Sequence, residues 1–194
     1  PAPHKAVADD TRAGAADLDA AADEPGPPGD GAASGPAQPP PIYPTRLPDP
    51  VRLLYRLQLP QRNVPAQLTW APEADQYHLR LEATGPLGQA VLVQTSQGGF
   101  DAAGLAPERF VDRRGARGAR AANFQRDIGR ITFSGPRIEH PTWPGAQDRL
   151  SWMAQLAAIC AAAGAMPPQV SMFVVDGRGL GDVWTFVDQG VETV

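Results

Sequence analysis

The chain is poor in cysteine and in lysine. Its 194 residues include one cysteine, Cys160, and one lysine, Lys5, against 16 arginines. A single cysteine excludes an intramolecular disulfide and any metal site built from paired cysteines. Cys160 lies in an alanine-rich run with helical spacing, where we expect it to be a small buried apolar side chain.

Long hydrophobic runs are missing as well. The longest, at residues 150–163, is interrupted by Ser151 and Gln155 and is too short to span a bilayer. The sequence therefore predicts no transmembrane segment in this chain, and no signal peptide is visible. The chain begins at Pro1 without an initiator methionine and stops on what reads as the start of another strand. We therefore expect the natural protein to extend beyond both ends.

The familiar catalytic and cofactor motifs are also missing. Neither HExxH nor GxSxG occurs, and the three histidines (His4, His78 and His140) are expected to face solvent. The glycine-rich stretch "GRGLGD" at residues 177–182 precedes a strand pattern, whereas a dinucleotide loop would precede a helix, so we predict a hairpin turn. The sequence thus predicts no catalytic residue, no metal site and no cofactor. A hydrolase with a site assembled from distant residues is the least favoured alternative.

Negative charge is concentrated at the N-terminus. Residues 1–50 hold eight acidic side chains against three basic ones, a net charge of −5. Residues 51–194 hold 14 arginines against 13 acids, a net charge of +1, and the two parts sum to −4. A nearly neutral body without a basic surface argues against nucleic-acid binding.

Composition divides the chain into a tail and a folded body. Residues 1–44 are rich in alanine, proline and acidic side chains and have few large apolar residues, so they are predicted to be a disordered tail or linker. Residues 45–194 are predicted to form one β-rich domain that is truncated at its C-terminal end.

The body shows alternation of apolar and polar residues typical of half-buried antiparallel strands. Residues 51–57, 66–70 and 77–83 alternate in this way, and further strand-like runs recur about every ten residues. The predicted fold class is therefore mainly β: a curved antiparallel sheet or an open β-barrel with one packed α-helix.

One helix is expected over residues 148–163. Asp148 is a plausible N-cap, and Gly164 is a plausible C-terminal stop. At helical spacing one stripe is apolar, and we expect it to be the buried side of the helix. The stripe consists of Leu150, Met153, Leu156, Ala157 and Cys160, and Trp152 and Ile159 widen it.

Arginines gather around one predicted turn. Six lie between positions 109 and 126, with Asp112 as the one acidic residue among them. Such a group could bind an anion, a phospholipid headgroup or a partner protein, or it could be a solvated hairpin that protects the edge of a sheet. The candidate binding residues are Arg113, Arg114, Arg117 and Arg120.

Three stretches of the body resemble a known family: residues 43–58, 95–135 and 144–159. They contain a glycine–leucine–x–proline turn leading into "ERF", then strands with "NF" and "ITF", then an aspartate-led helix. In this order they are similar to exported bacterial proteins catalogued as domain-of-unknown-function family 3108. The matching residues are Gly104, Leu105, Pro107, Arg109, Phe110, Asn123, Phe124, Ile131, Phe133 and Asp148. The resemblance implies an antiparallel β domain exported to the periplasm or cell envelope, and it supplies no catalytic residues.

The leading functional hypothesis is a non-enzymatic envelope protein that binds a lipid-like or hydrophobic ligand. The alternative is a structural or protein-interaction module whose core is completely filled. The candidate partners are a lipid or another envelope protein, and the sequence leaves the oligomeric state open.

Overall fold

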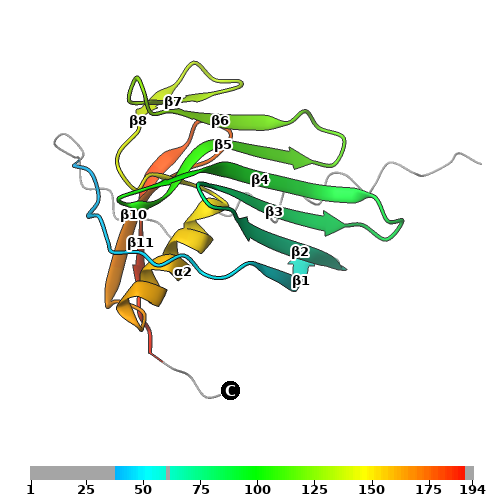
Figure 1. The fold of residues 1–194 in the computed structure, drawn as a ribbon. Helices are drawn as coiled ribbons and strands as arrows, with labels where there is room; N and C mark the ends of the chain where they lie inside the picture. The colour runs from blue at the N-terminus through cyan, green and yellow to red at the C-terminus, as the bar shows by residue number, and fades with distance from the viewer. Residues whose placement is uncertain (1–37, 60–61, 191–194) are drawn as a thin grey trace, which may run out of the picture.

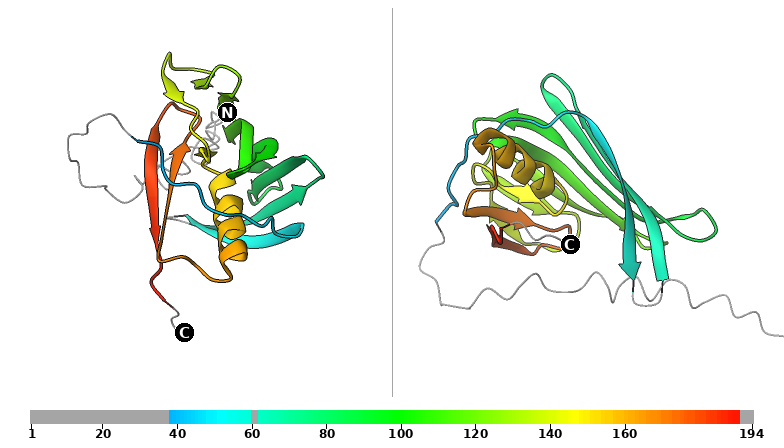
Figure 2. Two further views of the ribbon diagram at one scale, coloured as in Figure 1. Left: turned by 60° about the vertical axis from the view of Figure 1, so that its left-hand side comes forward. Right: turned by 90° about the horizontal axis from the view of Figure 1, so that it is seen from below.

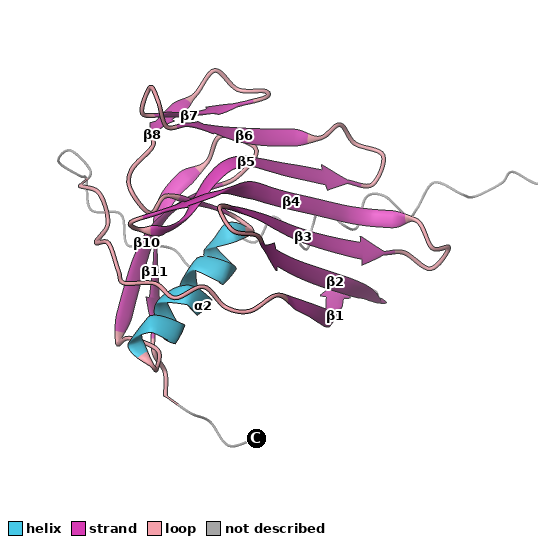
Figure 3. Cartoon of the chain, viewed as in Figure 1, coloured by secondary structure: helices cyan, strands magenta, loops and turns pink. Residues whose placement is uncertain are grey.

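The part of the chain that the structure describes is mainly β, with two sheets and one helix, which confirms the predicted fold class. A computed structural model describes residues 38–59 and 62–190 (Figures 1 and 3). The first 37 residues, which the composition assigns to the tail, lie outside these described ranges.

The larger sheet is an antiparallel meander in which each strand pairs with the next along the chain. Its strands are β1 (Val51–Leu59), β2 (Arg62–Pro72), β3 (Gln76–Thr84), β4 (Ala90–Asp101), β5 (Gly104–Arg114), β6 (Arg120–Gln125), β7 (Arg130–Phe133) and β8 (Glu139–Pro141). Within the described residues β1 and β8 are its two edges and do not pair, so no sheet closes into a barrel. The curved open sheet is therefore the form that the chain adopts.

The apolar alternation of the sequence becomes one face of this sheet. In the ladder between β2 and β3, Leu68 lies opposite Leu81 and Trp70 lies opposite Leu79. Directly opposed residues of an antiparallel pair point to the same side, so their side chains form a continuous apolar surface. Arg80, between Leu79 and Leu81 in β3, points to the other side and is exposed.

The smaller sheet has the order β11–β10–β9. It consists of β9 (Gln147–Asp148), β10 (Gln169–Val175) and β11 (Gly181–Val187), with β9 parallel to β10. The strands β10 and β11 are antiparallel and are joined by the "DGRGL" turn, which confirms the predicted hairpin. The carboxylate of Asp176 holds this turn by accepting hydrogen bonds from the backbone N–H groups of Arg178 and Leu180.

The helix α2 (Ser151–Ala163) ends as predicted and begins differently. Gly164 follows it in the left-handed conformation, with φ of 77°. The expectation that Asp148 is the N-cap is wrong, because Asp148 belongs to β9 and Leu150 occupies the cap position. The Asp148 carboxylate nevertheless accepts the N–H groups of Leu150 and Ser151, at 2.8 Å each, and so satisfies two donors at the helix start.

The predicted buried stripe of α2 is also wrong in part. The buried helical residues are Ser151, Ala154, Gln155, Ala158 and Ile159. Of the predicted stripe, Leu150 is fully buried and Ala157 is exposed, while Met153, Leu156 and Cys160 are half-buried. Of the two residues expected to widen it, Ile159 is buried and Trp152 is half-buried. The helix lies between two sheets, so small residues and a hydrogen-bonded glutamine occupy the positions of closest approach.

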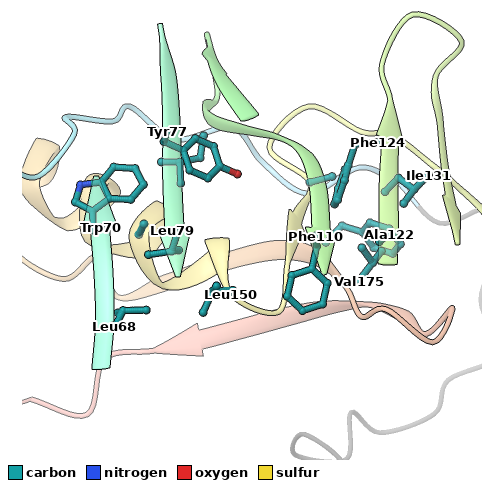
Figure 4. Close-up of a cluster of buried hydrophobic side chains, with 14 residues drawn as sticks. Leu68, Trp70, Tyr77, Leu79, Phe110, Ala122, Phe124, Ile131, Leu150 and Val175 are labelled. Atoms are coloured by element: carbon teal, nitrogen blue, oxygen red, sulfur yellow. The ribbon is translucent and has the colours of Figure 1, made fainter. Parts of the chain in front are cut away.

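The two sides of α2 pack into different clusters. Toward the larger sheet, Leu150 and Ala154 join a core that includes Trp70, Tyr77 and Phe110 (Figure 4). Toward the smaller sheet, Ile159 packs with residues of β10, and Figure 2 shows the helix between that hairpin and the larger sheet. The β10 residues in this second cluster are Val170, Met172 and Val174.

An extended segment, residues 38–50, crosses the helix before β1 begins (Figure 1). Tyr43 packs in the cluster between α2 and the smaller sheet, and its hydroxyl accepts the backbone N–H of Ser171 at 2.9 Å. Further on, the Arg46 N–H donates to the Ala158 carbonyl at 2.9 Å. The described body therefore includes residues that composition assigned to the tail.

Candidate functional site

The turn between β4 and β5 is held by buried amides. Gln155 of α2 donates its side-chain N–H to the carbonyl of Ala103 at 2.6 Å, and its Oε1 accepts the N–H of Leu105 at 2.8 Å. Gly104 between them has φ of 104°, and a Cβ there would lie 2.5 Å from the Gln155 Oε1. Gln147 adds a hydrogen bond to the Leu105 carbonyl at 2.9 Å. The motif around Gly104 and Leu105 is therefore explained by attachment of this turn to the helix.

A second buried polar group joins the larger sheet to the start of α2. The Ser96 hydroxyl of β4 donates to Asp148 Oδ2 at 2.6 Å, and Tyr77 Oη of β3 lies 3.0 Å from Ser96 Oγ. Asp148 Oδ1 accepts the two N–H groups at the helix start, so both carboxylate oxygens of Asp148 have a partner. This network connects β3, β4 and α2 inside the core.

Burial dominates the acid–base behaviour of this network. Loss of solvent raises the pKa of Asp148, and the hydrogen bonds from Ser96, Ser151 and Leu150 lower that pKa in part. The pKa of Tyr77 is raised well above its ordinary value, first by burial and then by the nearby charge of Asp148. Both groups are enclosed by the core, so we assign the network to stability.

Arginines line a cleft at one end of the molecule, which we call the arginine cleft. It has a volume of about 600 Å³ and is formed by the turn between β5 and β6, the residues after β7 and the β10–β11 turn. Its lining residues are Asp112, Arg114, Arg117, Gly118, Ala119, Arg120, Ser134, Gly135 and Arg178. Four arginines against one aspartate give the lining a formal charge of +3.

The one acidic residue of the cleft is paired with its neighbour on the strand. Asp112 and Arg114 are two residues apart on β5 and point to the same side, with Arg114 Nη2 and Asp112 Oδ2 at 3.1 Å. Their side chains are 12% and 16% exposed, so the pair is largely enclosed. Arg114 Nη1 is buried without a hydrogen-bond partner, which leaves one guanidinium donor unsatisfied at the cleft.

A close backbone approach brings the fourth arginine to the cleft. A Cβ added at Gly177 would lie 3.2 Å from both the Cβ and the carbonyl oxygen of Arg120. Glycine at this position lets the β10–β11 turn lie against the start of β6. As a result Arg178, the next residue, faces the same cleft as Arg120.

The structure brings together three of the four arginines predicted to bind. Arg114, Arg117 and Arg120 line the cleft, and Arg113 does not. Arg113 lies next to Arg114 on β5, and adjacent strand residues point to opposite faces. Sequence reasoning missed Arg178, which lies 58 positions after Arg120, although the glycine-rich turn that positions it was visible.

The cleft lining contains no pair of groups suited to general acid–base or nucleophilic catalysis. Its one hydroxyl, Ser134 Oγ, accepts the N–H of Ala121 at 2.9 Å, and Asp112 is engaged by Arg114. What the lining offers is guanidinium groups, which recognise phosphate and carboxylate oxygens.

The histidines of the body lie elsewhere. His78 is exposed on β3, as expected. His140 differs from the expectation, because its ring packs against Phe133 and Phe173 and its Nε2 lies 2.9 Å from the Gly179 carbonyl. The described residues contain no group of three or more histidine, cysteine, aspartate or glutamate side chains placed to hold a metal ion.

Comparisons with family models, with curated proteins and with solved structures find no match for the chain. The resemblance to the exported family therefore stays a prediction. Among residues 38–59 and 62–190 the structure contains no helix with the length and apolar character needed to cross a membrane.

Proposed function

We propose that the chain is a non-enzymatic binding domain whose arginine cleft takes a phosphate-bearing anion. The observation that carries this proposal is the convergence of four arginines from two hairpins, β5–β6 and β10–β11, around a volume of about 600 Å³. That volume is in the usual range of ligand sites in proteins. In this proposal Arg117, Arg120 and Arg178 contact the anion, and Arg114 positions the wall of the cleft.

Phosphate oxygens suit this site better than a neutral ligand does. The lining carries four arginines and one aspartate, and its formal charge of +3 favours an anionic ligand. Guanidinium groups bind phosphate through paired N–H donors, and several converging charges raise the local concentration of anions. The phosphate could belong to a lipid headgroup or to a soluble molecule, and the two sources can be separated by experiment.

Packing of the core bears on the lipid-like ligand expected from the sequence. The concave side of the larger sheet is covered by α2, with Leu150, Ala154 and Phe173 in its main cluster. This arrangement favours binding of the headgroup part of a lipid over enclosure of its acyl chain. A location in the periplasm or envelope remains part of the proposal, and its support is the family resemblance.

The second candidate is a protein-interaction module, in which an acidic partner occupies the arginine cleft. The filled contact between α2 and both sheets favours it, since such a core leaves the surface as the place of function. Titration with a phosphate probe separates the two candidates.

The test is titration of the protein with inorganic phosphate, and separately with vesicles of phosphatidylglycerol mixed with phosphatidylcholine. Wild type should bind phosphate, and the double variant Arg117→Ser/Arg120→Ser should bind at least about tenfold more weakly, since charged hydrogen bonds contribute about 1.5–3 kcal/mol each. The control variant Arg56→Ser/Arg113→Ser removes the same charge outside the cleft and should bind like wild type.

The outcomes are distinct. Vesicle retention that is lost in the cleft variant and weakens with salt identifies a headgroup, because exposed charges are screened over about 8–10 Å. Phosphate binding without vesicle retention identifies a soluble anion. If wild type binds neither probe at low salt, or if both variants lose binding equally, the proposed function is wrong.

A further inference from the structure

The strand β1 is a long edge of the larger sheet. It pairs with β2 along all nine of its residues, and no other strand of the described chain pairs with its outer side. The opposite edge, β8, has three residues and ends at Pro141. Short edges and proline prevent the addition of another strand, so β8 is protected in a way that β1 is not.

Apolar side chains on both faces of β1 reach solvent. Leu54 is 78% exposed, and Val51, Leu53 and Tyr55 are each about 40% exposed. Leu53 and Tyr55 lie opposite Leu68 and Ala66 of β2, so their inner sides are covered and their outer sides are open. A strand added to this edge would place its own apolar residues beside them.

The charges on β1 select what can be added. Arg52 and Arg56 lie on the same face as Leu54, one on each side of it, and both are exposed. Their partners across the ladder are Thr69 and Pro65, so no acidic side chain faces them from β2. An acidic residue at the matching place of an added strand would therefore be attracted by an arginine that β2 leaves unneutralised.

The same charges disfavour a second copy of this chain as the added strand. Pairing of β1 with another β1 would bring four arginines onto one face of the joined sheets, and like charges across a ladder are destabilising. The arginines thus act against self-association while they favour an acidic partner.

We propose that the β1 edge binds an extended segment of a partner protein by strand addition. The segment alternates apolar residues, which lie beside Val51, Leu53 and Tyr55, with acidic residues, which lie beside Arg52 and Arg56. Backbone hydrogen bonds supply affinity in this mode of recognition, and the alternating side chains supply specificity. This surface is separate from the arginine cleft, and the inference does not depend on the proposed function.

The probe is a fluorescent peptide with valine at every second position. The positions between the valines are glutamate, threonine and glutamate, in that order. A matched peptide carries lysine in place of both glutamates. Wild type should bind the glutamate peptide about tenfold more tightly, because two exposed charge pairs replace two repulsions of similar size. The variant Arg52→Glu/Arg56→Glu should reverse this preference.

Two further measurements test whether the peptide adds as a strand. N-methylation of alternate peptide residues removes N–H donors without changing the charge, so it should abolish binding to wild type. The cleft variant Arg117→Ser/Arg120→Ser should bind the glutamate peptide as wild type does. The inference is overturned if the two peptides bind wild type equally, if N-methylation has no effect, or if charge reversal on β1 leaves the preference unchanged.

Discussion

At the scale of single residues, buried polar side chains connect parts of the chain that are distant in sequence. Gln155 joins α2 to the β4–β5 turn, and Asp148 joins the helix start to Ser96 of β4. Each of these groups is buried, and each has its main hydrogen bonds satisfied by the protein. Burial of a polar group without such partners costs free energy, so these residues fix how the helix sits on the sheet.

The carboxyl group of Asp148 should make stability depend on pH. Because burial raises its pKa, the folded protein holds this proton more tightly than the unfolded chain does. The stability that Asp148 contributes is fully present below the ordinary pKa of an aspartate, and it is lost as the pH rises through the folded pKa. In Asp148→Asn that dependence disappears.

The measurement is the thermal midpoint of wild type and of Asp148→Asn at a series of pH values. As the pH is lowered from above the folded pKa of Asp148 to below the ordinary pKa of an aspartate, the thermal midpoint of wild type should rise relative to that of the variant. A difference between the two proteins that stays constant from acid to neutral pH would show that folding does not raise this pKa.

At the scale of elements, α2 is shared by two sheets. Its buried residues facing the larger sheet are small or hydrogen-bonded, and its residues toward the smaller sheet pack with aromatic rings. Trp152 stacks on Phe186 with ring centroids 4.9 Å apart. The half-buried Leu156 belongs to this second cluster, whereas Leu150 is fully buried in the first.

Truncation of these two leucines should therefore have different effects. Leu150→Ala leaves a cavity in the main core and should lower the free energy of unfolding by about 2–5 kcal/mol. Leu156→Ala removes carbon atoms that are only half-buried, so the loss should be about 1 kcal/mol. Chemical denaturation of both variants tests this order, and equal losses would place the two side chains in equivalent environments.

At the scale of the whole molecule, the two sheets form one packed unit. Phe173 and Val175 of β10 belong to the same cluster as Trp70 and Phe110 of the larger sheet. The segment at residues 38–50 adds a further connection, because the Trp70 indole N–H donates to the Pro48 carbonyl at 3.0 Å. Separation of the sheets would expose this shared core, so we expect them to unfold together.

Hydrogen exchange should show that the two sheets unfold together and that the edge strand β1 opens more easily. Amides in the centre of β3 and β10 should exchange with the same free energy of opening, because both strands are released only by global unfolding. Those of β1, an edge strand with apolar residues open to solvent, should exchange at a lower free energy. Independent exchange of β10 at a much lower free energy than β3 would show that the smaller sheet opens alone.

The sequence by itself determined the local structure of this protein. Alternating apolar residues indicated the strands, a glycine-rich stretch indicated the β10–β11 turn, and the single glycine Gly164 indicated the end of α2. These features depend on the conformational preferences of a residue and its near neighbours, and a one-dimensional pattern contains that information. The cluster of arginines around the β5–β6 turn was also visible, because these residues are near neighbours in the sequence.

Only the tertiary structure decided which of these residues meet. Gln155 lies outside the apolar stripe predicted from the sequence, and it is buried because it hydrogen-bonds to Ala103 and Leu105, about fifty positions earlier. Arg178 joins Arg120 because Gly177 permits two backbones to approach, while Arg113 is excluded by the alternation of its strand. Such pairings are selected by packing and by hydrogen bonds across the fold, and neither leaves a periodic mark in the sequence.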